Sequence, residues 1–137
     1  MSYTLGDIRN VCLVGPSNSG KTQLTEALLH AGGKIKTCGS VDKGDTVSDF
    51  TPRERDLGHS QYASICHLDH GGLHVNLLDT PGYRDFYGRA LSVMRAGDTP
   101  AVAVKAEHGL ETATRRMMTA DRHASLCRMI SINSNDS

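Results

Sequence analysis

The chain has 137 residues, a mass of 14.8 kDa and 15 basic against 15 acidic side chains, so its formal net charge is zero. This balance excludes a general electrostatic attraction to nucleic acid or anionic membrane, and 38% apolar with 22% charged residues exclude a disordered or fibrous chain. The length fits one domain. We find neither a signal peptide nor an apolar run of membrane-spanning length, so we expect a cytoplasmic protein without a membrane partner.

Short apolar runs alternate with segments of helical period, which is typical of α/β proteins with a mainly parallel sheet. Residues 11–14 predict a buried strand. Residues 21–30 predict a helix, and its expected apolar face consists of Leu24, Ala27, Leu28 and Ala31. Residues 33–61 show no sustained period and are rich in Gly, Asp, Lys and Arg, so we interpret them as a long switch-like loop.

A hairpin is predicted next, because two apolar runs, 62–68 and 73–78, flank His70-Gly71-Gly72. It would place one antiparallel strand at an edge of the sheet. Further along the chain, the apolar pattern predicts a helix at 85–95, a buried strand at 101–104, a helix at 113–124 and a last strand at 129–132.

The cysteines are scattered without a CxxC pair, which favours reduced thiols over disulfides. Cys66, His67 and His70 form one loose cluster, but a zinc site needs three or four ligands with a recognisable spacing. We therefore expect no zinc site.

The segment between the first strand and the first helix matches the phosphate-binding motif G-x-x-x-x-G-K-[ST]. Backbone amides of such a loop bind the β-phosphate, Lys21 can bridge β- and γ-phosphate oxygens, and the Thr22 hydroxyl can ligate Mg²⁺. We therefore predict a P-loop NTPase of the α/β class, with helices on both faces of the sheet. The motif residues are Gly15, Pro16, Ser17, Asn18, Ser19, Gly20, Lys21 and Thr22.

A D-x-x-G motif follows the second hairpin strand, and open α/β sheets bind their ligands at such carboxyl ends of strands. Asp79 can hold Mg²⁺ through water, and the Gly82 amide can sense a γ-phosphate. Taken alone, the motif is equally well explained as a turn that ends a strand. The phosphate-binding loop upstream favours a nucleotide site made with Asp79, Thr80, Pro81 and Gly82.

A polar segment follows the last predicted strand, where GTPases carry the guanine-reading sequence N-K-x-D. Ser134 stands in place of the Lys. A polar tail is also common at a chain end, and a P-loop does not select the base, so guanine recognition, an uninvolved tail and ATP binding all stay open. The residues concerned are Asn133, Ser134, Asn135 and Asp136.

Together these motifs resemble the GTP-binding domain of elongation factor G and, more closely, of elongation-factor-G-like proteins within the translational GTPases. The resemblance rests on Ile8-Arg9-Asn10, on Val47-Ser48-Asp49-Phe50, and on Asp79-Thr80-Pro81-Gly82 followed by Asp85-Phe86. It implies binding of GTP or GDP with Mg²⁺, hydrolysis of GTP, the ribosome as a partner, and loops that reorder around the γ-phosphate.

The resemblance also implies catalytic and metal-binding residues, with departures from the family pattern. Ser60 stands where the family has a Mg²⁺-ligating Thr, so the implied metal ligands are Thr22, Ser60 and Asp79, and His59 replaces the preceding Ile. Tyr83 stands where classical members carry a water-orienting His, and a phenol cannot replace an imidazole near neutral pH. Tyr83 can also simply pack beside Phe86. The candidate catalytic residues are Lys21, Gly82 and Tyr83.

The family's GTP-binding domain continues beyond the last strand predicted here. We therefore expect residues 1–137 to form a single, C-terminally truncated GTP-binding domain that hydrolyses GTP slowly if at all. The alternatives are a non-catalytic nucleotide-binding or interaction module and a fragment without function of its own.

Overall fold

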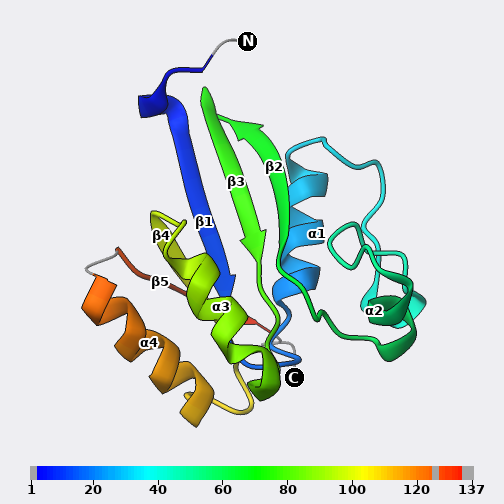
Figure 1. The fold of residues 1–137 in the computed structure, drawn as a ribbon. Coiled ribbons are helices and arrows are strands. Elements are labelled where there is room, and N and C mark those ends of the chain that lie inside the picture. Colours follow the sequence, from blue (N-terminus) through cyan, green and yellow to red (C-terminus); the bar gives the residue numbers. More distant parts are fainter. Residues whose placement is uncertain (1–2, 125–126, 134–137) are drawn as a thin grey trace.

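The computed structural model describes residues 3–124 and 127–133, and five strands within them form one sheet. The strand order is β2-β3-β1-β4-β5. Strand β2 runs antiparallel to β3, and the other neighbouring strands are parallel. The fold class predicted from the sequence is therefore confirmed. The strands are β1 (Ile8–Val14), β2 (Ser64–His70), β3 (Leu73–Asp79), β4 (Thr99–Lys105) and β5 (Met129–Asn133) (Figure 1).

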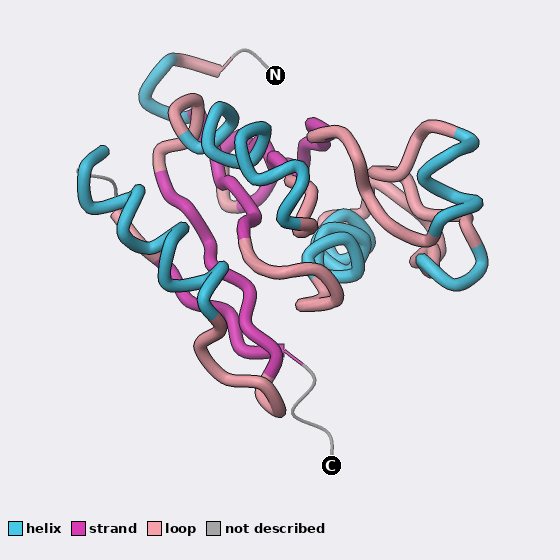
Figure 2. Tube along the Cα trace, turned by 60° about the horizontal axis from the view of Figure 1, so that its bottom comes forward, coloured by secondary structure: helices cyan, strands magenta, loops and turns pink. Residues whose placement is uncertain are grey.

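Helices cover both faces of the sheet, as the tube view shows (Figure 2). Helix α1 (Lys21–Ala31) lies on one face, and α3 (Tyr87–Met94) and α4 (Thr112–Ala124) lie on the other. The short helix α2 (Pro52–Leu57) belongs to the segment 33–61. Three 3₁₀ turns complete the described part: η1 (Leu5–Asp7), η2 (Val41–Lys43) and η3 (Arg84–Phe86). None of these helices combines the length and apolar character needed to cross a membrane.

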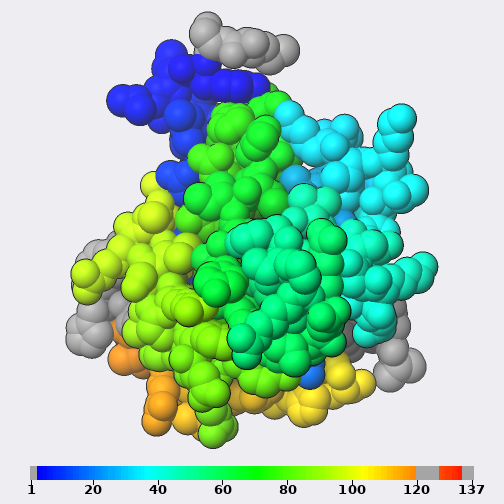
Figure 3. Space-filling view, turned by 45° about the vertical axis from the view of Figure 1, so that its right-hand side comes forward, coloured from blue at the N-terminus to red at the C-terminus, as the bar shows by residue number. Residues whose placement is uncertain are grey.

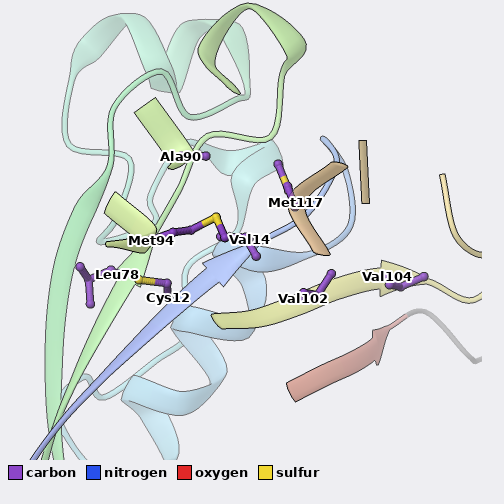
Figure 4. Close-up of a cluster of buried hydrophobic side chains, with 8 residues drawn as sticks. All are labelled: Cys12, Val14, Leu78, Ala90, Met94, Val102, Val104 and Met117. Carbon is purple, nitrogen blue, oxygen red and sulfur yellow. The ribbon is translucent and has the colours of Figure 1, made fainter. Parts of the chain in front are cut away.

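Two apolar clusters hold these layers together, because successive side chains of a strand point to opposite faces of the sheet. On the face of α1, Leu29 packs against Cys66, Leu68 and Leu77. The other cluster joins the strands to α3 and α4. Its buried members are Cys12, Val14, Leu78, Ala90, Met94, Val102, Val104 and Met117 (Figure 4).

The predicted hairpin is confirmed, with β2 and β3 joined by the two residues Gly71 and Gly72. Their φ angles are 57° and 82°. Positive φ at both central positions is the property of a type I′ turn, whose twist matches that of the two strands.

The predicted apolar face of α1 is wrong. Leu28 is 36% exposed and Ala27 is also exposed, whereas Thr25, Glu26 and Leu29 are buried. The reason is that α1 is covered twice: the sheet packs against Leu29, and the segment 33–61 packs over Glu26. A hydrophobic pattern cannot identify a buried face that includes a carboxylate.

The segment 33–61 is more ordered than an irregular loop. Thr51 caps α2, since its hydroxyl accepts a hydrogen bond from the Glu54 backbone N–H at 3.2 Å and donates one to the Glu54 carboxylate at 2.7 Å. The same buried carboxylate accepts bonds from the backbone N–H groups of Gln61 at 2.9 Å and Tyr62 at 3.0 Å. Glu54 thus joins the start of α2 to the strand that follows the segment.

Candidate nucleotide-binding site

The phosphate-binding loop connects β1 to α1 and requires glycine at two positions. Gly15 has a φ of 144°, and a Cβ there would collide with the Ala103 carbonyl oxygen of β4. Gly20 has a φ of 83°, and a Cβ there would collide with the Asn133 side chain. The absence of a side chain at both positions lets the loop backbone approach Ala103 of β4 and Asn133 at the end of β5.

The other loop residues lie where the motif predicts them. Ser19 is buried, and its hydroxyl donates to the Pro16 carbonyl at 2.9 Å, which closes the loop on itself. Ser17 and Asn18 line a cavity of about 360 Å³ together with Thr22.

Lys21 is the first residue of α1, its side chain folds back onto this loop, and it is only 6% exposed. Its Nζ donates to the carbonyl oxygens of Pro16 at 2.7 Å and Gly15 at 3.1 Å. Burial lowers the pKa of Lys21 to about 8, and the negative charge of Asp79 opposes that shift. Lys21 therefore remains mostly a cation at neutral pH, with little water around it, which is suited to binding a phosphate oxygen.

The D-x-x-G residues lie directly against the phosphate-binding loop. A Cβ on Gly82 would lie 2.6 Å from both Lys21 Nζ and the backbone nitrogen of Ser17. Pro81 is buried, and the Thr80 hydroxyl donates to the Leu13 carbonyl at 2.7 Å. Thr80 therefore fixes the turn to β1, and the backbone of Gly82 is the part that lies beside Lys21.

Thr22, Ser60 and Asp79, the predicted metal ligands, are brought together. The Thr22 hydroxyl donates to Asp79 Oδ2 at 2.9 Å and lies 3.4 Å from the Ser60 hydroxyl. Asp79 is 2% exposed, and its Oδ1 has no hydrogen-bond partner among the described residues. Hydroxyl and carboxylate oxygens are the ligands that Mg²⁺ prefers, so this donor set, with one carboxylate oxygen unpartnered, fits that ion.

Burial raises the pKa of Asp79 to about 6, although the Lys21 charge and the Thr22 hydrogen bond act in the opposite direction. The nearby Asp49 also raises it. Asp49 is a site residue that our sequence reasoning missed: its Oδ1 accepts the Ser60 hydroxyl at 2.6 Å. Asp49 could have been noticed in the sequence, because it belongs to Val47-Ser48-Asp49-Phe50, one of the segments that resemble the family.

Tyr83 lies at the rim of the cavity and is 41% exposed. Its ring contacts the His59 ring, with 4.3 Å between centroids and 43° between planes. Phe86 instead lies under the guanidinium of Arg89, which is 5.1 Å from the ring centroid. The ring contact of Tyr83 is therefore with the segment 33–61 rather than with Phe86. Figure 3 shows that segment in cyan and blue-green beside the green residues that follow it.

Of the four residues predicted to read guanine, the structure describes Asn133. Its side-chain nitrogen donates to the carbonyl oxygens of Ser19 at 3.4 Å and Gly20 at 3.5 Å. These long bonds place the end of β5 against the phosphate-binding loop. Ser134, Asn135 and Asp136 lie outside the described residues.

Zinc was the alternative raised by Cys66, His67 and His70. Cys66 is buried beneath α1, whereas His67 and His70 are exposed. Within residues 3–124 and 127–133, no three His, Cys, Asp or Glu side chains are grouped as a metal site.

Glu26 is a second residue that our sequence reasoning missed, and it attaches the segment 33–61 to α1. Its carboxylate is fully buried and accepts the backbone N–H groups of Gly39 at 2.8 Å and Val47 at 2.6 Å. Charged hydrogen bonds of this kind contribute about 1.5–3 kcal/mol each, and unpaired buried amides are costly.

We expect Glu26→Ala to lower the melting temperature and to accelerate hydrogen exchange at the Gly39 and Val47 amides, because both lose their acceptor. Mass-spectrometric or NMR hydrogen exchange measures this effect. Glu111→Ala removes an exposed carboxylate and serves as the control. Unchanged exchange at Gly39 and Val47 in the Glu26 variant would contradict the anchoring role.

Comparison with known proteins shows what this chain is similar to. A family model described as the elongation factor Tu GTP binding domain matches residues 6–137. An elongation factor G-like protein of Mycobacterium tuberculosis (strain ATCC 25618 / H37Rv) is 42% identical over 112 residues, covering 82% of this chain and 16% of that protein. The mitochondrial ribosome-releasing factor 2 of Drosophila grimshawi is 36% identical over 132 residues, covering 96% of this chain and 18% of that protein.

Solved structures share the fold. A crystal structure of a protein from Thermus thermophilus matches with a TM-score of 0.87 at 40% identity, covering 91% of this chain and 19% of that one. The elongation factor SelB of Methanococcus maripaludis, solved with the GTP analogue GppNHp, matches with a TM-score of 0.70 at 18% identity, covering 94% and 23% of the two chains. The chain spans 16 to 18% of the length of the two curated relatives.

Proposed function

The chain belongs to the family of elongation factor Tu-type GTP-binding domains, and from this premise we propose that it works as a magnesium-dependent GTPase that hydrolyses GTP slowly. The observation that carries the proposal is the convergence of Lys21, Thr22 and Gly82 on one cavity, with the buried Asp79 carboxylate hydrogen-bonded to Thr22. A phosphate-binding loop alone is compatible with many nucleotide proteins. A second acidic and glycine-containing loop pressed against it is the arrangement that senses a γ-phosphate.

Each residue has a proposed task. The loop amides of residues 15–20 and the Lys21 ammonium bind the β- and γ-phosphates, and the Gly82 amide contacts the γ-phosphate. Thr22 and Ser60 ligate Mg²⁺ through their hydroxyls, and Asp79 holds it through water. When bound, the ion neutralises negative charge on the phosphate oxygens.

Base recognition is proposed for Asn133, Ser134, Asn135 and Asp136. Support comes from the contact of Asn133 with the phosphate-binding loop, because it brings the end of β5 to the site. A Ser in place of the family Lys removes an aliphatic stem that would pack on the base, so we propose weakened selectivity for guanine over adenine.

The ribosome is proposed as the partner, with support from the relatives' names, which include a ribosome-releasing factor. The cytoplasmic location stays a prediction, because the relatives include both bacterial and mitochondrial proteins.

Thermal melting with Mg²⁺ and either GDP, GTP or ATP tests this function. A ligand present at about 100 times its dissociation constant stabilises the folded state by about 2.7 kcal/mol. We expect GDP and GTP to raise the melting temperature and ATP to raise it less. Equal shifts with all three nucleotides would contradict guanine selectivity, and no shift with any of them would contradict a nucleotide site.

A further inference from the structure

A histidine of the segment 33–61 lines the phosphate cavity beside the end of the D-x-x-G loop. His59 lines the cavity together with Lys21, Thr22 and Gly82. The next residue, Ser60, has its hydroxyl 3.4 Å from that of Thr22. The residue that follows His59 therefore lies next to Thr22, at the end of the phosphate-binding loop.

One hydrogen bond assigns the tautomer of His59. Its Nδ1 lies 3.0 Å from the Leu57 carbonyl oxygen. A carbonyl oxygen only accepts, so Nδ1 must carry the hydrogen, and Nε2 of the neutral ring then presents a lone pair. No described residue donates to Nε2.

The Tyr83 ring fixes the plane of this imidazole. The centroids are 4.3 Å apart, and Tyr83 directly follows Gly82, the residue that lies against Lys21 Nζ. The imidazole is thereby held on the side of the cavity where Lys21 and the Gly82 amide meet. The Nε2 lone pair is the acceptor that this rim offers to a water molecule beside a bound terminal phosphate.

We propose that His59 is a catalytic residue whose Nε2 accepts a hydrogen bond from the attacking water, and that Tyr83 positions the His59 ring. This inference rests on the proposed GTPase function. The water oxygen forms a bond to the γ-phosphorus as the bond to the β–γ bridging oxygen breaks, and that electron pair leaves with GDP. The water proton passes to a γ-phosphoryl oxygen. His59 orients the water and takes up no charge.

The test is single-turnover hydrolysis of GTP by the full chain with Mg²⁺, together with the Kd for a fluorescent GDP analogue. We expect His59→Ala to slow hydrolysis about 100-fold, the loss typical of a misplaced reactant, with the Kd changed less than about twofold. In His59→Gln the amide oxygen is also an acceptor, so we expect it to recover about tenfold over His59→Ala.

Variants of Tyr83, whose ring contacts His59, test whether Tyr83 acts by positioning the His59 ring. We expect Tyr83→Ala to slow hydrolysis while leaving the Kd unchanged, and we expect Tyr83→Phe, which keeps the ring contact, to hydrolyse GTP faster than Tyr83→Ala. His108→Ala is the matched control, since His108 is exposed and outside the cavity.

The outcomes distinguish this inference from the function on which it rests. A chain that binds no nucleotide would overturn the proposed function. A chain that binds GTP but hydrolyses it as fast with Ala at position 59 as with His overturns only the role of His59. A chain that binds GTP without hydrolysing it overturns both the catalytic role and the GTPase activity, and leaves nucleotide binding intact.

Discussion

Replacing Lys21 by Ala is expected to weaken the binding of GTP at least about 100-fold, because charged hydrogen bonds contribute about 1.5–3 kcal/mol each and this ammonium is proposed to contact two phosphate oxygens. The expectation depends on burial. A lysine that is 6% exposed and held by the Pro16 and Gly15 carbonyls loses little further hydration when phosphate arrives. Titration with a fluorescent GTP analogue measures the change.

The control for this prediction is Lys36→Ala, which removes an exposed lysine from the same half of the chain. The Lys36 variant is expected to bind GTP with the parent affinity. Both variants should be checked for a cooperative melting transition, so that lost binding is not confused with unfolding. A folded Lys21 variant that binds within about tenfold of the parent, a difference of about 1.4 kcal/mol, would contradict the central place of this side chain.

The parts of the site that could be predicted from the sequence are those fixed by local geometry. Gly15, Gly20 and Lys21 occur at a fixed spacing because a tight loop must join a strand to a helix around a phosphate. The D-x-x-G turn could be placed for the same reason: the carboxyl ends of β1 and β3 lie at the same edge of a parallel pair.

The parts that could not be predicted depend on contacts between segments distant in sequence. Glu26 and Asp49 are buried only because the segment 33–61 folds over α1, and neither carboxylate contributes to an apolar pattern. The pairing of His59 with Tyr83 likewise requires two loops to meet.

Helix α2, which our sequence analysis did not predict, begins with a recognisable sequence motif. Thr51-Pro52-Arg53-Glu54 is a capping box with proline at the first helical position, and it begins α2. Our prediction used only the composition and the lack of a long period in residues 33–61, and it did not use this local motif. Short helices held by one buried carboxylate, here Glu54, are therefore easily missed when periodicity is the main criterion.

Asp79→Asn is expected to make the nucleotide-free chain more stable at pH 7 while weakening Mg²⁺-dependent binding of GTP. Burial raises the pKa of Asp79 from 3.8 to about 6, so the folded state binds this proton more tightly than the unfolded state does. The stability contributed by the protonated carboxyl is therefore lost as pH rises from about 4 to about 6. At neutral pH the charge costs about 3 kcal/mol, and an amide of the same shape avoids that cost.

Melting curves of the parent and the Asp79→Asn variant from pH 4 to pH 8, in EDTA and without nucleotide, test the first half of this prediction. The two melting temperatures should be close at pH 4 and should diverge through pH 6, with the variant higher. Asp56→Asn, which alters an exposed carboxylate on α2, should show no such divergence. A difference independent of pH would contradict the burial of an ionised Asp79.

The second half of the prediction is the loss of metal dependence. In the parent, Mg²⁺ should tighten GTP binding, whereas in Asp79→Asn the affinity with Mg²⁺ should approach that measured in EDTA. A variant that is more stable than the parent but whose GTP binding no longer depends on Mg²⁺ identifies Asp79 as a functional carboxylate. Replacing a carboxylate that only supports the fold would instead make the protein less stable. A buried charge that destabilises the fold is explained by the ligand that it is placed to hold.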